Sequence, residues 1–280
     1  LADEPATAHR LLERLAEHCL ARGITLPGMR KVYTGGAPVF PRLLRAWQRL
    51  APAAQIDAVY GSTEAEPMAH IALDEMREDD AAAMAAGRGL LVGRPVPEIA
   101  LRIMAFAWGE PVGPFTRDEF AARCLPADAP GEIVVSGEHV LPGYLHGDGD
   151  AETKFRVDGV PWHRTGDAGC LDADGRLWLL GRCAARIADA HGILYPFTVE
   201  CAIADGPGVR RSAVVAHRGR RLLVIEPRPG TRPDIRALAE TLAWAQLDDI
   251  LLLPRLPVDA RHNAKIDYPA LLARLARHKS

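Results

Sequence analysis

The stretch "YGSTEAEP", from Tyr60 to Pro67, comes directly after the apolar run "QIDAV" and is the segment from which we predict the fold. An apolar run that ends at Gly61 indicates a buried strand. Thr63 followed three residues later by Glu66 fits a helix capping box, so we expect a helix to begin at Thr63 and Glu64. A capping box stabilises a helix end, so this pattern alone does not indicate a functional site. The same residues would also suit a nucleotide, because helix N-termini bind phosphate, carboxylates bind Mg²⁺ and aromatic rings stack on purines.

Elements on both sides of this stretch extend the pattern. The segments "MRKVYT" (29–34) and "QIDAVYG" (55–61) resemble short apolar strands, with "RLLRAWQRL" (42–50) as a helix between them and another helix over 5–22. Strands that alternate with helices predict an α/β layer with a largely parallel sheet. The acidic stretch "DEMREDDAAAMAA" that follows is typical of a solvated helix face or loop.

From about residue 88 the chain changes to shorter strand patterns, with "DADG" as a hairpin turn between the last two. Beyond Gly181 and Arg182 the pattern becomes helix, two strands, helix, strand and helix, which is typical of a small α+β domain. The fold class is therefore α/β plus α+β, with two domains at 1–181 and 182–280. The four strand segments of the middle region are "EIALRIM", "GEIVVSG", "WHRTGDAGCL" and "RLWLLG".

Composition excludes several classes of protein. The 280 residues carry a net charge of −2 from 34 basic and 36 acidic side chains, so no basic surface for nucleic acid or lipid is indicated. No apolar run approaches the roughly 18 residues of a membrane span, and we expect a cytoplasmic protein. The five cysteines show no C-x-x-C spacing and the ten histidines no H-x-x-x-H pattern, which gives a zinc site little support.

Three further motifs have both a structural and a functional interpretation. The glycine pair in "YTGGAPVFP" is a turn, but glycines also let the backbone approach a flat ligand. Asp167 in "HRTGDAG" suits a turn that bonds its own backbone, or a carboxylate that accepts both hydroxyls of a ribose. Arg182 in "LLGR" follows one hairpin later and could reach the same sugar. Each of these signals is weak alone.

Lys265, in "RHNAKIDY", is unusual because the chain uses arginine for nearly all of its other positive charge. The sequence has only three other lysines, at 31, 154 and 279. A solvent-exposed lysine before a helix is the structural alternative.

The order of these motifs, GGAP, YGSTE, GEIVVSG with GYLHG, RTGD, GR and then a lysine, resembles the adenylate-forming superfamily of acyl-CoA synthetases, luciferases and peptide-synthetase adenylation domains. The resemblance implies an incomplete large AMP-binding domain followed by a small mobile C-terminal domain, with ATP and Mg²⁺ as cofactors. It implies that Glu64 binds the metal and that Thr63, Glu64 and Lys265 are catalytic. The residues that it implies for nucleotide binding are Gly35, Gly36, Ala37, Pro38, Tyr60, Gly61, Ser62, Thr63, Asp167 and Arg182.

That resemblance also gives the lysine a chemical reason. In adenylation a carboxylate attacks the α-phosphate of ATP, so two anions meet and negative charge gathers in the transition state. A slim ammonium on a flexible stem can enter between them, whereas a planar guanidinium fits poorly. Among the other residues, Gly36, Ala37 and Tyr60 would line the adenine, Thr63 the phosphate, and the Asp167 and Arg182 pair the ribose.

Two departures from the superfamily pattern refine the expectation. A Ser/Thr/Gly-rich phosphate loop followed by lysine is absent, so the chain resembles the later half of a longer enzyme that alone would bind ATP weakly and turn over nothing. The segment "CAARIADAHGILYP", and Ala264 where a glycine is usual, resemble the olefin β-lactone synthetase branch. That branch adenylates a long-chain β-hydroxy acid and closes it to a β-lactone, releasing AMP and pyrophosphate, and other enzymes of hydrocarbon synthesis are its expected partners.

Other possibilities stay open at this stage. A fatty-acyl-AMP or acyl-CoA ligase is the alternative among enzymes, and a non-catalytic nucleotide-binding scaffold in a lipid-enzyme complex is the alternative of another class. The sequence does not identify a general base for the hydroxyl proton, since each candidate histidine suits a structural role as well. The candidate histidines are His163, His191 and His262, and the apolar residues expected to border an acyl tunnel are Val39, Phe40, Met68 and Ile71.

Overall fold

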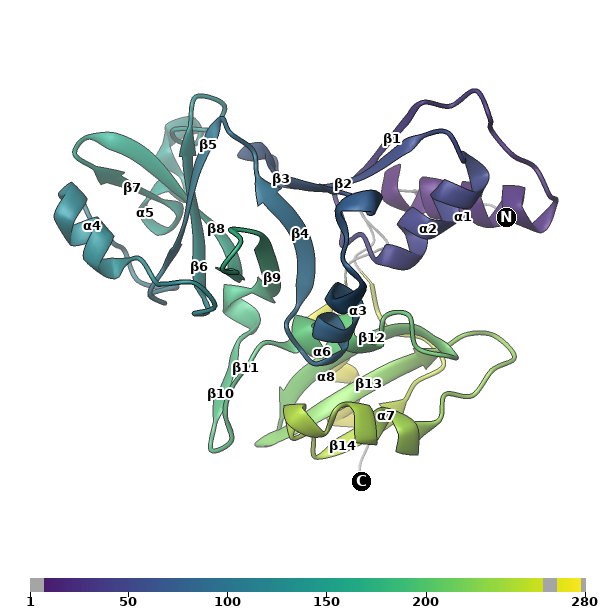
Figure 1. Cartoon of the computed structure of the whole chain (residues 1–280). Coiled ribbons are helices and arrows are strands. Elements are labelled where there is room, and N and C mark those ends of the chain that lie inside the picture. Colours follow the sequence, from purple (N-terminus) through teal and green to yellow (C-terminus); the bar gives the residue numbers. More distant parts are fainter. Residues whose placement is uncertain (1–7, 259–265, 278–280) are drawn as a thin grey trace.

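The computed structural model describes residues 8–258 and 266–277, and Figure 1 shows their arrangement. Lys265 and His262 lie outside the described residues. A nine-stranded sheet occupies the first part of the chain, and a three-stranded sheet with helices on both faces occupies the last part. No described helix has the length and apolar composition needed to cross a membrane.

The first strands form as the sequence predicts. Helix α1 (Ala8–Ala21) precedes β1 (Lys31–Thr34), and α2 (Pro41–Leu50) connects β1 to β2 (Gln55–Ser62). The two strands pair in parallel, because a helix between them returns the chain to the same edge. Trp47 and Leu50 of α2 are fully buried against the sheet, which explains the apolar spacing of that helix.

Two expectations about the next segment are wrong. Thr63 and Glu64 do not begin a helix; they form the turn between β2 and β3 (Ala65–Ala72), which pair antiparallel. The sheet is also not largely parallel, because every described pairing in it after the first is antiparallel. The physical reason is the short connection at residues 63 and 64, since a two-residue turn can only reverse the chain.

The rest of the large sheet is built from antiparallel strands, as the change to shorter patterns indicates. Its strand order is β1-β2-β3-β4-β9-β8-β6-β5, with β7 paired to β8. Figure 1 shows β5 to β8 at one end of the molecule and α1 and α2 at the other. The bounds are β4 (Leu90–Pro95), β5 (Ile99–Met104), β6 (Gly131–Gly137), β7 (Lys154–Val157), β8 (Val160–Leu171) and β9 (Leu177–Arg182), with α3 (Glu78–Ala85), α4 (Arg117–Arg123), α5 (Asp150–Thr153) and 3-10 turns at Leu73–Glu75 and Leu145–Gly147.

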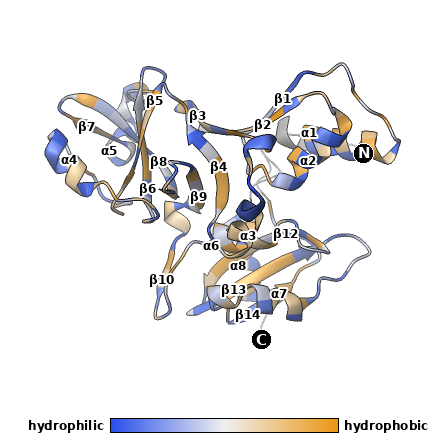
Figure 2. Ribbon diagram, in the orientation of Figure 1, coloured by the Kyte–Doolittle hydropathy of each residue, from blue (hydrophilic) through white to orange (hydrophobic). Residues whose placement is uncertain are grey.

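The last part of the chain has the predicted α+β pattern. Its sheet order is β12-β13-β14, and alternate residues of β13 face two separate apolar clusters. Leu223 and Ile225 pack toward α6 and α7, and Leu222 and Val224 pack toward α8, so period two places apolar residues on both faces. Figure 2 shows β13 as an apolar ribbon accordingly. The bounds are β10 (Ile187–Asp189), β11 (Gly192–Leu194), α6 (Pro196–Ile203), β12 (Val209–His217), β13 (Arg220–Pro227), α7 (Ile235–Thr241), β14 (Asp249–Leu252) and α8 (Tyr268–Arg277), with 3-10 turns at Cys183–Ala185 and Ala243–Ala245.

Two glycines lie where the last part of the chain packs against the first part: Gly87 in the loop between α3 and β4, and Gly181 in β9. A Cβ on Gly87 would lie 2.5 Å from the Trp244 ring, and a Cβ on Gly181 would lie 2.5 Å from Cβ of Phe197. Both glycines also have positive φ, at +90° and +112°. A division into two domains at residue 182 stays a prediction.

Candidate active site

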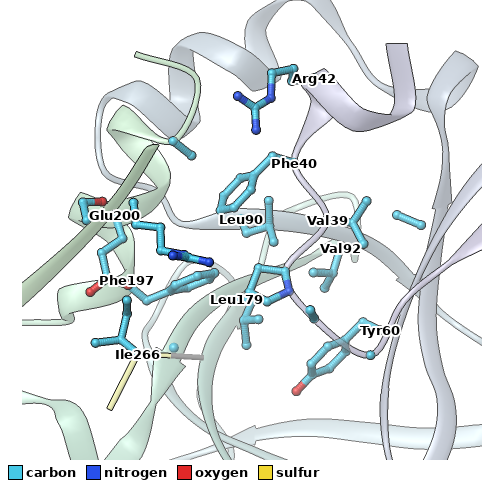
Figure 3. A pocket seen from close by; sticks show the side chains of 18 of the residues that line it. Val39, Phe40, Arg42, Tyr60, Leu90, Val92, Leu179, Phe197, Glu200 and Ile266 are labelled. Carbon is cyan, nitrogen blue, oxygen red and sulfur yellow. The ribbon is translucent and has the colours of Figure 1, made fainter. Parts of the chain in front are cut away.

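A cavity of about 1040 Å³ lies between the large sheet and the last part of the chain. Residues from the loop after β1, from β2, β4, β8 and β9, and from α6 and β12 line it. Figure 3 shows Tyr60 and Glu200 toward opposite ends of the cavity, with the apolar side chains of Leu90, Val92 and Leu179 between them. The cavity is large enough for a ligand of nucleotide size, since small-molecule sites commonly measure about 300 to 1,000 Å³.

Tyr60, Asp167 and Arg182 meet at the wall of this cavity. The Tyr60 hydroxyl donates a 2.8 Å hydrogen bond to Oδ2 of Asp167, and Nη1 of Arg182 lies 3.2 Å from Oδ1. Burial, and then the neighbouring Asp167 carboxylate, raise the pKa of Tyr60 well above its ordinary value, so its hydroxyl stays protonated and can donate. Tyr60, which is 107 positions from Asp167 in the sequence, therefore forms one polar cluster with Asp167 and Arg182.

A bulge in β8 directs Asp167 into this cluster. Asp167 pairs directly with Arg182 across β8 and β9, but residues 165 to 167 oppose a single residue, Ile133, of β6. Such bulges re-aim side chains. Gly166 adopts a φ of +74° there, and the Thr165 hydroxyl accepts a 3.0 Å hydrogen bond from the Asp167 amide. In the motif "RTGD" the threonine hydroxyl thus holds the Asp167 amide, and the glycine allows the positive φ of the bulge.

The loop "GGAP" after β1 contributes the cavity residues Gly36, Ala37 and Pro38. Its two glycines differ in surroundings. A Cβ on Gly35 would lie 2.7 Å from the carbonyl oxygen of Val59, so the close approach at Gly35 is to β2 and not to the cavity. Gly36 has a φ of +76° and no atom within 4 Å of a built Cβ, which leaves its open side for a ligand.

The turn between β2 and β3 carries the predicted metal residue. Tyr60 and Gly61 line the cavity, whereas Ser62, Thr63 and Glu64 are not part of its lining. Oε1 of Glu64 accepts a 2.9 Å hydrogen bond from the Tyr144 hydroxyl. Partial burial acts to raise the pKa of Glu64, but polar contacts from Ser62 and Tyr144 outweigh it and lower the pKa below its ordinary value. Glu64 is therefore an ionised carboxylate at neutral pH.

Sequence reasoning did not single out Tyr144 or Glu200. Tyr144 belongs to the motif "GYLHG", and its contact with Glu64 spans 80 positions, which no local pattern reveals. Glu200 lines the cavity, where its Oε1 accepts hydrogen bonds from the Tyr268 hydroxyl at 2.8 Å and the Val214 amide at 3.1 Å. Burial raises the pKa of Glu200 to about 7. The sequence feature that could have indicated Glu200 is that it is the only charged residue in the apolar helix "PFTVECAI".

Several minor expectations have clear outcomes. Val39 and Phe40 line the cavity, but Met68 and Ile71 are buried in the main apolar core and do not border it. His163 is buried, and burial and then the nearby Lys154 lower its pKa to about 4, so it is a neutral core residue.

Comparison with known proteins identifies the family. Residues 4–145 match the model of the family described as AMP-binding enzyme. The chain belongs to this family.

Relatives and solved structures extend that match. An olefin beta-lactone synthetase of Stenotrophomonas maltophilia is 36% identical over 275 residues, covering 91% of this chain and 48% of the relative. Another from Xanthomonas campestris pv. campestris is 35% identical, covering 87% of this chain and 46% of the relative. The amide bond synthetase McbA of Marinactinospora thermotolerans superimposes with a TM-score of 0.73 at 24% identity, covering 98% of this chain and 53% of that chain. The chain thus has the fold of these enzymes and spans about half the length of the curated relatives it matches.

Proposed function

We propose that this chain is the later half of an ATP-dependent ligase that activates a long-chain β-hydroxy carboxylic acid as its adenylate and closes it to a β-lactone. The observation that carries the proposal is the convergence of Tyr60, Asp167 and Arg182 on one cavity beside the "GGAP" loop. A carboxylate, a guanidinium and an aromatic ring beside an exposed loop backbone are the groups that bind a ribose and a purine. The family match and the two lactone synthetase relatives support it.

Each residue has a role in this proposal. Asp167 accepts the ribose hydroxyls and Arg182 donates to the same sugar. Gly36 and Ala37 present backbone to the adenine, and the ring of Tyr60 packs on it while its hydroxyl holds Asp167. Thr63, on the exposed turn after β2, donates to phosphate.

Glu64 is the residue proposed to hold Mg²⁺. It fits the ion, because it is an ionised oxygen donor and Mg²⁺ is usually bound by one or two carboxylates together with substrate phosphates. Among the described ranges no cluster of three or more His, Cys, Asp or Glu side chains could form a closed protein cage for a metal. When bound, the ion would neutralise charge on the phosphates as pyrophosphate leaves.

Lys265 is proposed to stabilise the charge that develops at the α-phosphate. Its neighbour in the chain, Ile266, lines the cavity. The Asp267 amide donates a 3.0 Å hydrogen bond to the Pro257 carbonyl, and Val258 pairs with Ile266.

Ring closure takes place within a single bound molecule, the acyl-adenylate. The β-hydroxyl oxygen attacks the acyl carbon, the bond to the phosphate oxygen breaks, and AMP leaves with the electron pair while the hydroxyl proton passes to a base or water. Orientation within a bound adenylate removes the entropy of a second encounter, and the reaction needs no external thiol. Other enzymes of hydrocarbon synthesis are the partners that such a product suggests.

The test is mass spectrometry of the products that the full-length enzyme forms from ATP, Mg²⁺ and a long-chain β-hydroxy acid, with and without coenzyme A. We expect β-lactone and AMP without coenzyme A. Lys265→Ala and Lys265→Arg should both lower the rate by about 10²- to 10³-fold, the usual effect of removing one group that stabilises transition-state charge. Lys31→Ala, at an exposed lysine, is the matched control.

Other products would redirect the proposal. A coenzyme A thioester in place of lactone would make the enzyme an acyl-CoA ligase and leave the nucleotide site standing. No AMP with any acid would favour a nucleotide-binding scaffold. Isothermal titration should show weak ATP binding by the 280-residue chain alone, and tight binding would contradict the half-enzyme interpretation.

A further inference from the structure

The turn that carries Glu64 is held by a segment distant in sequence. This segment runs from Leu141, after β6, to Lys154 at the start of β7, and we call it the clasp. The Leu141 amide donates a 2.7 Å hydrogen bond to the Glu64 carbonyl, and the Tyr144 hydroxyl donates a 2.9 Å hydrogen bond to Oε1 of the Glu64 side chain. The clasp therefore fixes both the backbone and the carboxylate of the same residue.

Tyr144 is itself fixed within the clasp. Its amide donates a 2.8 Å hydrogen bond to Oδ1 of Asp150, the first residue of α5. The ammonium of Lys154 lies 5.2 Å from the centre of the Tyr144 ring and donates to the Leu141 carbonyl. The backbone and ring of Tyr144 are thus restrained by separate contacts. Lys154, one of the chain's four lysines, supplies the contact to the ring.

Restraint of this kind matters for a carboxylate that binds a cation. A free glutamate side chain loses rotamer entropy when a bound cation orders it. A carboxylate has two oxygens with about four lone-pair sites, so Oε1 can accept from Tyr144 while capacity remains for an ion. Partners that orient metal-binding carboxylates by hydrogen bonds typically change metal affinity or activity by about 10- to 100-fold when they are removed.

We infer that Tyr144 is a positioning residue that orders the Glu64 carboxylate for the divalent cation of the nucleotide complex. The inference rests on the proposed function, since it takes Glu64 as the cation-binding residue. It assigns Tyr144 no contact with substrate, and it gives the motif "GYLHG" a role that the nucleotide site alone does not require.

The test uses the full-length enzyme and cation binding as its readout. Mn²⁺ replaces Mg²⁺, and its dissociation constant is measured by electron paramagnetic resonance in the presence of an ATP analogue that cannot be cleaved. The variants are Tyr144→Phe, Glu64→Gln and the double variant. Tyr33→Phe makes the same change at an exposed tyrosine and serves as the control. Nucleotide affinity without metal, and circular dichroism, check that the fold is intact.

Tyr144→Phe should weaken Mn²⁺ binding by about 10- to 100-fold and leave metal-free nucleotide affinity unchanged. In the Glu64→Gln background the Tyr144→Phe change should have no further effect, because residues that act through one another are not additive. Unchanged Mn²⁺ affinity in Tyr144→Phe, or the same loss in both backgrounds, would overturn the inference. If Glu64→Gln keeps the wild-type Mn²⁺ affinity, the metal assignment itself is wrong and the inference fails with it.

Discussion

Replacing Glu200 by glutamine should stabilise the protein above neutral pH. The pKa of Glu200 is about 7 in the fold and 4.5 when it is unperturbed, because burial disfavours the charged form. Between these values the unfolded chain has lost the proton that the folded chain keeps. Unfolding then releases protons, so the free energy of unfolding falls as pH rises from about 4.5 to about 7 and levels off above that.

The size of the effect follows from the same two values. At about 1.4 kcal/mol per pH unit, their separation corresponds to about 3 kcal/mol. Glutamine carries no proton to lose, and its amide oxygen can still accept from the Tyr268 hydroxyl and the Val214 amide. Tyr268 from α8 and the Val214 amide from β12 contact Glu200 directly, and Arg211 of β12, which lies 3.5 Å from Glu226, lines the same cavity.

The assay is urea denaturation of the 280-residue chain at several pH values between about 5 and about 8, followed by circular dichroism and fluorescence. The difference between Glu200→Gln and wild type should be below about 1 kcal/mol at the acidic end and approach about 3 kcal/mol above pH 7. Glu240→Gln, at an exposed residue of α7, should show no such growth. A difference that stays constant with pH would refute the assignment of a neutral carboxyl in this cavity.

Three further changes test the scaffold and the cluster. Arg164→Met should lower the free energy of unfolding by about 3 to 5 kcal/mol in thermal or urea denaturation, because it leaves the buried Glu132 carboxylate without its ion pair at 2.8 Å. Gly181→Ala should cost about 1 to 3 kcal/mol by the same measurement, since a Cβ at that positive φ would collide with Phe197. Tyr60→Phe should weaken ATP binding by the full-length enzyme about tenfold in isothermal titration, because it removes the hydroxyl that hydrogen-bonds Asp167, the carboxylate proposed to bind the ribose; unchanged affinity would count against that role.

The elements that the sequence predicts well are those whose pattern is local. Helix α2 and strand β2 have apolar residues at their own period, and helix α6 matches "PFTVECAI" residue for residue. The hairpin turn at "DADG" likewise depends on adjacent residues. Such elements need no knowledge of what packs against them.

The errors arise where distant residues decide. Thr63 and Glu66 satisfy a capping pattern, yet the chain turns back into β3 because "AEPMAHIA" pairs with β2. The acidic stretch expected to be solvated contains Asp80, which is 3% exposed because Arg176, 96 positions away, pairs with it at 3.0 Å. No local spacing distinguishes this aspartate from its exposed neighbours.

The contacts of the candidate site likewise divide into those that local sequence predicts and those that depend on distant residues. Asp167 and Arg182 are a single hairpin apart and could be expected to meet, and Tyr60 joins them only because β2 and β8 belong to one sheet. The Tyr144 contact with Glu64 depends on a loop that returns to the sheet, and the sequence gives no signal for it.

The contacts at Gly87 and Gly181 are of a kind that salt does not screen. Trp244 packs on Gly87 and Phe197 packs on Gly181, and both are van der Waals contacts between uncharged groups. Salt screens the attraction between exposed charges over about 8 to 10 Å, so it weakens pairs such as Arg42 and Asp205, 3.7 Å apart, but not the two ring contacts. Sulfate and phosphate strengthen the burial of apolar surface. The last part of the chain should therefore keep its place on the large sheet in dilute buffer and in concentrated salt alike.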